Sequence, residues 1–192
     1  MTEEQPGRIP MFICVVGTNG TGKTYYARNT LAHTELNKPG GKVLVITPHQ
    51  EEWQGVEEIH PTELRHFYGL RKIFFFDHEE TLFKDIIQYM YNGMIIFDDC
   101  KFYLGSTIEQ KFNRLLISRK QIRCDMVCIA HSLSEIPRKF FVYNPRIVLF
   151  RTTIPPYNRK DVLFDFERIC EEIENVNKRA ESTPHYHKII KL

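Results

Sequence analysis

Six short hydrophobic runs divide the chain, and polar residues do not alternate within them. The runs end near Val16, Thr47, Asp77, Asp98, Ala130 and Phe150. A strand with one face in water alternates apolar and polar residues, so uninterrupted runs predict strands that are buried on both faces. Strands of this kind are typical of a parallel sheet between layers of helices.

Helical patterns separate several of these runs. Apolar residues recur every three or four positions in residues 82–90 and again in residues 108–116, which predicts one helix in each segment. Asp77 to Glu80 resembles a capping box that starts the first of these helices, and Pro39-Gly40-Gly41 ends an earlier helix. The alternation of strands and helices predicts an α/β fold with a mostly parallel central sheet flanked by helices.

Two segments lie outside this alternation. Residues 48–72 are polar, contain the only tryptophan, Trp53, and are interrupted by His60-Pro61, so we expect a surface excursion there. Residues 152–158 predict a turn after the last core strand. Apolar residues then recur from Val162 to Val176 and give a further helix one narrow apolar seam, which is expected to pack on its own domain.

The length of the chain fits a single domain. Its 192 residues with 42% hydrophobic content suffice for one sizeable core. We expect a flexible segment at 1–10 and one domain at 11–192, with its core at 11–151 and a C-terminal helix and short tail strand at 157–192. No apolar run approaches the ~20 residues that span a bilayer, and residues 1–10 are too polar for a signal peptide. A cytoplasmic protein without a transmembrane segment is therefore expected.

Charge is unevenly distributed although the net charge is only +2. Residues 111–160 carry eleven Lys or Arg against two acidic residues, whereas the rest of the chain carries fifteen against twenty-two. A basic segment suits an anionic polymer or the nucleotide of a neighbouring subunit, and an ordinary solvated face explains it equally well. The five cysteines form no C-x-x-C pair, which favours reduced thiols over disulfides or zinc. His185-x-His187 lacks further metal ligands nearby.

Glycines dominate the segment between the first predicted strand and the helix after it. Its sequence is Gly17-Thr18-Asn19-Gly20-Thr21-Gly22-Lys23-Thr24, which has the spacing of a phosphate-binding loop. Glycines let backbone N–H groups turn inward around an anionic phosphate chain, and the dipole of the following helix adds positive potential. Lys23 is expected to reach the β- and γ-phosphates of a nucleotide, and Thr24 is expected to bind Mg²⁺.

Polar residues end two further predicted strands. Asp98 and Asp99 follow one of them, and His131 and Ser132 follow the next. Because the carboxyl ends of parallel strands gather around a ligand crevice, all are expected near the phosphate loop. Asp98 would hold the water shell of Mg²⁺, and Asp99 would orient or deprotonate the attacking water. His131 or Ser132 would contact the γ-phosphate or that water, although a histidine at a strand end is also compatible with a structural role.

Arg119 ends the predicted helix that begins at Ile108. About three helical turns separate the two residues, so Arg119 lies near the buried face but at its end. Two interpretations remain open. The arginine projects past the sheet into the nucleotide site of a neighbouring subunit, or its stem covers apolar surface of its own domain.

Taken in order, these motifs resemble the FtsK/HerA superfamily of DNA-pumping ATPases, and within it the packaging ATPases of icosahedral viruses with internal membranes. The resemblance covers residues 11–151. It rests on the phosphate loop, Asp98-Asp99, Arg119-Lys120 before the strand at 126–130, His131, and the segment from Asn144 to Arg151, which resembles the family's final core strand between two arginines. The closing segment 186–190 resembles the short terminal strand of the viral members.

The resemblance implies a RecA-like P-loop NTPase fold of the additional-strand type. It also implies a ring of six subunits that hydrolyses ATP with Mg²⁺ to move double-stranded DNA, with partners at a viral capsid vertex or membrane. Arg119, or else Arg146 or Arg151, would act across the subunit boundary. The family usually has Gln where this chain has His131, and Glu where it has Asp99. Because the charge of a histidine varies near neutral pH, we expect the hydrolysis rate to vary between pH 6 and 8.

Other classes of protein also contain a phosphate loop. The chain has no L-S-G-G-Q-like segment of an ABC-type ATPase and no N-K-x-D motif of a GTPase. A small nucleotide kinase remains open, because the basic region at 111–160 could serve as its lid. Two more alternatives remain: a filamentous-phage assembly ATPase resembling zonula occludens toxin, which normally carries a membrane helix, and a scaffold that binds ATP to assemble and turns over little.

Overall fold

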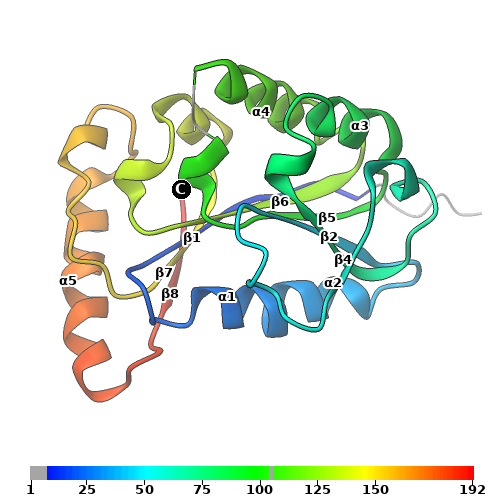
Figure 1. The fold of residues 1–192 in the computed structure, drawn as a ribbon. Coiled ribbons are helices and arrows are strands. Elements are labelled where there is room, and N and C mark those ends of the chain that lie inside the picture. The colour runs from blue at the N-terminus through cyan, green and yellow to red at the C-terminus, as the bar shows by residue number, and fades with distance from the viewer. Residues whose placement is uncertain (1–7, 104–105) are drawn as a thin grey trace, which may run out of the picture.

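The chain forms an eight-stranded sheet flanked by helices (Figure 1). The computed structural model describes residues 8–103 and 106–192. The strands are β1 (Phe12–Val16), β2 (Lys42–Thr47), β3 (Glu57–Glu58), β4 (Gly69–Phe74), β5 (Gly93–Phe97), β6 (Cys124–Ala130), β7 (Arg146–Leu149) and β8 (Lys188–Lys191). Their order is β3-β4-β2-β5-β6-β1-β7-β8, with β8 antiparallel to β7 and the other pairs parallel. The predicted α/β fold with a mostly parallel sheet is confirmed.

An additional strand, β6, separates β1 from β5. Its register aligns Val16 with Ala130 and Phe97 with Cys128. Because the three strands are parallel, the segments that follow them emerge at the same edge of the sheet. The phosphate loop, the two aspartates and His131 all belong to those segments. The sheet therefore brings the three predicted motifs together, and its order is the additional-strand arrangement that the resemblance implies.

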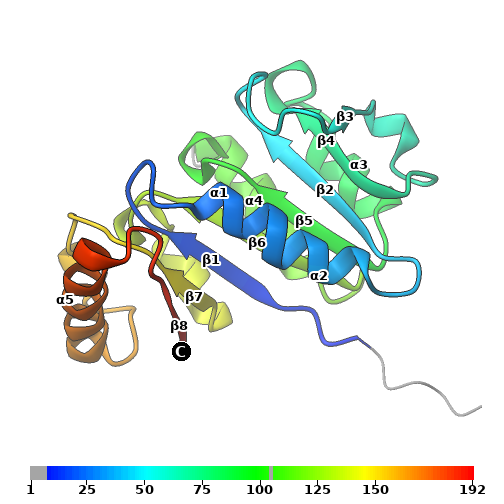
Figure 2. The same ribbon diagram turned by 90° about the horizontal axis from the view of Figure 1, so that it is seen from below.

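Helices cover both faces of the sheet (Figures 1 and 2). On one face, α1 (Lys23–Tyr26), a π-helical segment (Ala27–Ala32) and α2 (His33–Leu36) follow one another as a single helix. On the other face lie α3 (Leu82–Tyr89) and α4 (Ser106–Ser118), and α5 (Phe166–Ser182) packs near β7 and β8. Among the described residues, no helix combines the length and apolarity required to cross a membrane.

Each face of the sheet carries its own buried cluster. Within β1, Cys14 belongs to the cluster under α3, α4 and α5, whereas Val15 belongs to the cluster under α1. Both residues are fully buried. Strands that are covered on both sides have no position that favours a polar residue, which explains the uninterrupted hydrophobic runs in the sequence.

The aromatic run at 73–76 departs from the prediction of a strand that ends near Asp77. The strand β4 ends at Phe74, and a short 3-10 turn (Phe75–Asp77) follows. Phe75 is fully buried, with its ring centroid 4.7 Å from that of Tyr103. The predicted capping box at 77–80 does not form either, because Thr81 precedes α3 and makes no side-chain cap. Packing of the aromatic rings bends the chain before the strand reaches its predicted end.

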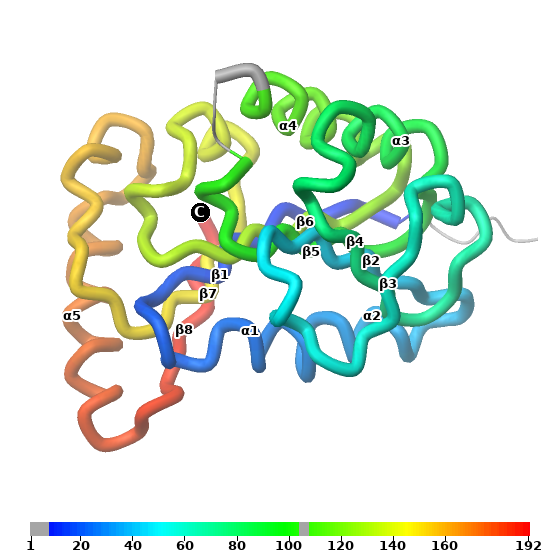
Figure 3. Tube along the Cα trace, in the orientation of Figure 1, coloured from blue at the N-terminus to red at the C-terminus, as the bar shows by residue number. Residues whose placement is uncertain are grey.

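The C-terminal segment follows the sequence prediction closely. The seam of α5 is buried at Phe166, Ile169, Ile173, Val176 and Ala180. The tail strand β8 begins slightly later than expected and pairs antiparallel with β7. Between α5 and β8 the tail passes beside the phosphate loop, as the trace of the chain shows (Figures 2 and 3).

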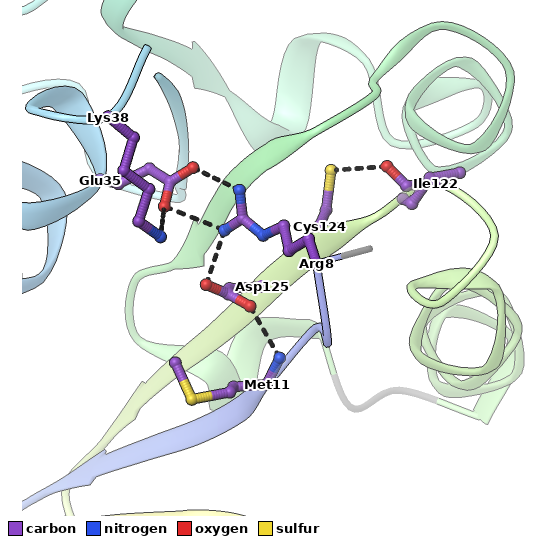
Figure 4. A network of polar contacts seen from close by, with 7 residues as sticks. All are labelled: Arg8, Met11, Glu35, Lys38, Ile122, Cys124 and Asp125. Carbon is purple, nitrogen blue, oxygen red and sulfur yellow. Dashed lines mark hydrogen bonds and ion pairs between the residues drawn. The ribbon is translucent and has the colours of Figure 1, made fainter. Parts of the chain in front are cut away.

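The N-terminal segment is tied to the domain by ion pairs (Figure 4). Arg8 donates to Glu35 and to Asp125, at 2.9 Å and 2.6 Å. Both acids are buried, and Asp125 also accepts the backbone N–H of Met11 at 2.7 Å. Arg8 is therefore held on the amino side of β6. Most of the segment predicted to be flexible, residues 1–7, lies outside the described part of the chain, and its flexibility stays a prediction.

Candidate functional site

The loop after β1 has the backbone form that a phosphate cradle requires. Gly20 and Gly22 have φ of +74° and +96°, a region in which side chains other than glycine are strained. A Cβ atom at Gly17 would lie 2.6 Å from Cβ of Phe150. Glycine is therefore required at these positions for conformational reasons, and the loop can present its backbone N–H groups to an anion.

Lys23 lies inside this loop with an exposed fraction of 8%. Its ammonium group donates to the backbone oxygen of Thr18 at 2.9 Å. Burial lowers the pKa of Lys23, and the negative charges of Asp98 and Asp99 oppose this effect. A positive charge in a poorly hydrated position interacts strongly with an anion placed beside it.

Asp98 is the buried acid of the site, with an exposed fraction of 5%. Its backbone N–H donates to Ile46 of the neighbouring strand at 2.9 Å. Its carboxylate accepts the indole N–H of Trp53 at 2.8 Å. Desolvation raises the pKa of Asp98 to about 6, and the hydrogen bond from Trp53 opposes the rise. An approaching cation would remove much of this desolvation cost.

Asp99 faces three cationic or titratable groups. Its carboxylate lies 3.4 Å from Nε2 of His49, 3.4 Å from Nζ of Lys101 and 3.6 Å from Nε2 of His131. The backbone at Asp99 has φ of +49°, a region that Asp and Asn occupy more readily than most residues. Oδ1 of Asp99 is buried without a hydrogen-bond partner among the described residues. Nε2 of His131 lies 3.6 Å from this oxygen, beyond hydrogen-bond distance.

Residues from separate segments converge on one cavity of about 250 Å³. The lining includes Lys23 and Thr24 of the phosphate loop, both aspartates after β5, and His131 after β6. Asn19 of the loop also lines it. The structure therefore brings together the loop, the acids and the histidine that the sequence singled out, while their individual roles stay predictions.

The oxygen atoms of this cavity fit Mg²⁺. Mg²⁺ prefers carboxylate and hydroxyl oxygens, keeps several waters, and is usually bound together with substrate phosphates rather than by an all-protein cage. Asp98 and Thr24 supply one carboxylate and one hydroxyl to the same cavity. Among the described residues, no group of three or more His, Cys, Asp or Glu is placed to hold a metal ion. His185 and His187 are not part of such a group.

The two candidate sensors at the end of β6 differ in accessibility. The side chain of His131 is 24% exposed and lines the cavity. Its backbone N–H donates to a carboxylate oxygen of Glu135 at 2.8 Å, which orients the segment. Ser132 is 1% exposed and does not line the cavity. The geometry therefore favours His131 for a contact with a ligand.

The loop between β2 and β3 supplies residues that the sequence did not reveal. Residues 48–72 are more than the surface excursion predicted from their polarity, because they include β3 and most of β4. His49 and Glu52 line the cavity, and Trp53 is 3% exposed. The one available signal was a single tryptophan within a polar stretch. Its partner Asp98 is 45 residues away in sequence, so no local pattern could identify the contact.

A second, more apolar cavity lies next to the phosphate loop. It has a volume of about 420 Å³ and is lined by Gly22, Tyr25, Tyr26, Thr30, Phe150, His185 and His187. The two histidines belong to the C-terminal tail, and Nδ1 of His185 lies 3.2 Å from the backbone oxygen of Thr21. The ring of His187 stacks on Phe150, with centroids 4.9 Å apart. The tail therefore forms one wall of a cavity that begins at the loop.

Arg119 does not project from the subunit. It is 6% exposed, and its guanidinium donates to the backbone oxygen of Leu116 at 2.8 Å. The guanidinium carbon also lies 5.1 Å from the ring centroid of Tyr143. The backbone oxygen of Arg119 accepts a hydrogen bond from the backbone N–H of Cys124. Cys124 starts β6, so this contact lies at the edge of the sheet opposite the cavity. Of the two interpretations of this residue, the structure favours the one in which it covers its own domain.

We expect the variant Arg119→Ala to lose stability. The change removes the contact with Tyr143 and the hydrogen bond to Leu116, which together contribute about 1 to 3 kcal/mol to the free energy of unfolding. Chemical denaturation of wild type and variant measures this difference. Arg114→Ala, at an exposed position on α4, the helix that ends just before Arg119, serves as the matched control and should change stability little. Equal stability of Arg119→Ala and wild type would show that the buried contacts are not structural.

We expect Asp98→Asn to stabilise the ligand-free protein at neutral pH. Because the pKa of Asp98 is about 6 whereas an unfolded aspartate has about 3.9, ionisation in the folded state lowers stability as the pH rises from about 4 to about 6. Above pH 6 the full difference, on the order of 3 kcal/mol, is present. Urea unfolding at pH 4, 5, 6 and 7.5 should show the advantage of the variant growing with pH. An advantage that stays constant with pH would contradict this account.

Solved structures share this fold at low sequence identity. The DNA-packaging ATPase B204 from Sulfolobus Turreted Icosahedral Virus matches with a TM-score of 0.66 and 10% identity, over 94% of this chain and 97% of that chain. The genome packaging NTPase B204 from Sulfolobus turreted icosahedral virus 2, in complex with AMPPCP, matches with a TM-score of 0.61 and 10% identity, over 94% of this chain and 96% of that chain. In contrast, no protein-family model and no curated protein matches the sequence.

A larger protein also contains the fold. The pCW3 conjugation coupling protein TcpA, in its monomer form with ATPgS, matches with a TM-score of 0.53 and 13% identity. The match covers 82% of this chain and 52% of that chain. At such identities these similarities establish the fold alone. They confirm the predicted P-loop NTPase fold and the predicted resemblance to viral packaging ATPases.

Proposed function

We propose that this protein is a Mg²⁺-dependent ATPase that moves double-stranded DNA, as a genome-packaging motor. The observation that supports this most is the single cavity in which a buried lysine of a phosphate loop meets two adjacent aspartates and a histidine. The similarity of the fold to a viral DNA-packaging ATPase supports the choice of substrate. The basic segment of the sequence, residues 111–160, supplies charge that suits a DNA backbone.

In this proposal each residue of the cavity has a separate task. Backbone N–H groups of the loop and the ammonium group of Lys23 bind the β- and γ-phosphates. When bound, Mg²⁺ would neutralise charge on the same phosphates, and Thr24 and Asp98 are the residues that would hold it. Asp99 orients the attacking water and accepts its proton. His131, within reach of both Asp99 and the cavity, contacts the γ-phosphate or the water.

The base and ribose of ATP would extend from the loop into the second cavity. That cavity offers the rings of Tyr25, Tyr26 and Phe150 beside Gly22 of the loop. Aromatic walls suit a planar base, because stacking contributes about 1 to 3 kcal/mol per base. Binding of the base would also stabilise the C-terminal tail, which supplies His185 and His187.

Phosphate release in the presence and absence of duplex DNA tests the proposed function. A motor should hydrolyse ATP faster with DNA, and this stimulation should fall steeply as salt rises, because phosphate contacts release counterions. A DNA-independent low rate would indicate a nucleotide-gated scaffold instead. Transfer of the γ-phosphate to a nucleoside or nucleotide would indicate a kinase. Stimulation by single-stranded DNA and not by duplex DNA would indicate a filamentous-phage assembly ATPase.

The ring itself is also part of this proposal. We propose a hexamer in which an arginine of one subunit reaches the nucleotide of the next. With Arg119 buried, the remaining candidates are Arg146, the first residue of β7, and Arg151, which follows β7, because both are exposed. Native mass spectrometry with ATPγS and duplex DNA measures the number of subunits directly.

Mixing two inactive variants should reveal an arginine that acts between subunits. Arg151→Ala lacks the proposed arginine, and Asp99→Asn lacks the proposed base, so a mixed ring contains some interfaces with both groups intact. We expect the mixture to regain part of the DNA-stimulated ATPase rate that each variant has lost. Arg146→Ala is tested in the same way. If neither mixture exceeds its separate components, an arginine contributed across the boundary is excluded at both positions.

A further inference from the structure

The only tryptophan of the chain donates to the proposed metal-binding carboxylate. Nε1 of Trp53 lies 2.8 Å from Oδ2 of Asp98. Trp53 is 3% exposed and Asp98 is 5% exposed, so water cannot readily replace either partner. An indole has one donor and no acceptor. Its hydrogen bond therefore needs an acceptor at this place, and the carboxylate of Asp98 provides it.

The loop that carries Trp53 is fixed from several sides. The guanidinium of Arg28 donates to the backbone oxygen of Gln54 at 3.0 Å. Nζ of Lys72 donates to the backbone oxygens of Gln50 and Glu52, both at 3.1 Å. The helix after the phosphate loop and the strand β4 thus hold the loop independently of the aspartates.

The indole ring itself is packed in the cluster under α1. This cluster also contains Tyr26, Val45, Val56 and Ile96. The backbone at Trp53 has φ of +56°, which costs a non-glycine residue of order 1 kcal/mol or more and persists only where the surroundings determine it. Both the loop anchors and the packing therefore hold the N–H group at one position beside Asp98.

We propose that Trp53 is a positioning residue for Mg²⁺: its N–H group holds Oδ2 of Asp98 and leaves the other carboxylate oxygen to face the metal and its water shell. This proposal rests on the proposed function, because it concerns the same nucleotide site. Groups that orient a metal ligand typically contribute 10- to 100-fold to metal affinity. Trp53 touches neither nucleotide nor metal in this account, so it is not a catalytic residue.

Trp53→Phe removes the N–H group and keeps an aromatic ring in the cluster. The affinity for a fluorescent ATPγS analogue is measured by anisotropy over a range of Mg²⁺ concentrations. We expect the Mg²⁺ concentration that gives half of the maximal tightening to rise about 10-fold in the variant. Affinity in EDTA should stay unchanged, because the phosphate loop is intact. The ATPase rate at saturating Mg²⁺ should approach that of wild type.

Val56→Ala is the matched control for a loosened cluster. Val56 is 8% exposed and packs in the same cluster without contacting Asp98 through a hydrogen bond. It should lower thermal stability through lost packing in this cluster, and it should leave the Mg²⁺ dependence of ATPγS binding unchanged. An equal shift of the Mg²⁺ dependence in both variants would show that Trp53 acts only through packing, which would overturn the proposal.

The emission of Trp53 provides a second readout that does not depend on activity. Because it is the only tryptophan, the intrinsic fluorescence reports this one contact. Addition of Mg²⁺ to the protein with ATPγS should change the emission, whereas ATPγS in EDTA should change it little, and Asp98→Asn should remove the response. An identical response with and without Mg²⁺ contradicts the proposal. Failure of wild type to bind ATPγS at all would instead refute the proposed function.

Discussion

Lys23→Ala is expected to abolish nucleotide binding. The ammonium group of Lys23 is the buried positive charge of the cavity, with 8% of the residue exposed. Desolvation already lowers its pKa, so a phosphate placed beside it gains a strong, poorly screened partner. Loss of such a preorganised group typically lowers a rate by about 10²- to 10³-fold through the transition state alone. Loss of ground-state binding adds to this, and hydrolysis should fall below detection.

Calorimetric titration with ATPγS and Mg²⁺ measures the loss of binding, and phosphate release measures the loss of hydrolysis. Lys178→Ala is the matched control, because Lys178 is exposed on α5 and should behave as wild type. Thermal melting should show that Lys23→Ala is folded, since removal of a buried charge relieves a desolvation cost. Wild-type affinity in a folded Lys23→Ala protein would refute the nucleotide site proposed at this loop.

Asp99→Asn is expected to retain nucleotide binding and to lose turnover. The amide has the shape of the carboxylate but cannot act as the base that accepts the proton of the attacking water. General-base catalysis typically contributes 10²- to 10⁴-fold to a rate, and we expect a loss of about this size. Asparagine also tolerates the positive φ of +49° at this position. The backbone should therefore stay as it is.

Single-turnover hydrolysis and equilibrium binding of ATP separate the two effects. ATP should bind Asp99→Asn with an affinity close to that of wild type, while the rate of the chemical step falls. Asp77→Asn replaces an exposed acid after β4 and should leave both quantities unchanged. A hydrolysis rate in Asp99→Asn within a factor of a few of wild type would exclude Asp99 as the base, and His131 would then become the residue to test.

The elements of the core could be predicted because their signals are local. Continuous apolar runs gave β1, β2, β5, β6 and β7 within a residue or two of their observed bounds. The exception is the run that contains Phe75, where the chain turns early. Tyr103 and Phe83 contact Phe75 from other segments, and Phe97 packs against Tyr103. The apolar run itself does not encode this packing.

The main lining residues of the candidate site could also be predicted from the sequence. The phosphate loop is contiguous, and strands of a parallel sheet deliver their next residues to a common edge. Asp98, Asp99 and His131 therefore reach the cavity whatever the details of the loops. His49 and Trp53 could not be assigned in this way, because their contacts depend on the path of a loop that returns over the sheet.

The position of the Arg119 side chain could not be predicted from the sequence either. Its place at the end of a helix is local information, and helical geometry allowed both a projecting and a buried side chain. The ring of Tyr143, contributed by a segment 24 residues later in the chain, lies against the guanidinium. A contact of this kind forms only after α4, β6 and the following turns have assembled.

By itself the sequence determined the fold class, the phosphate loop and the strand ends that carry the acids, because each depends on residues that are adjacent or on the fixed direction of parallel strands. Only the tertiary structure decided which side chains support those acids. Trp53 meets Asp98, Arg119 is buried under Tyr143, and His185 reaches Thr21. These pairs are distant in sequence, and their meeting depends on side-chain packing among many elements, which no local pattern specifies.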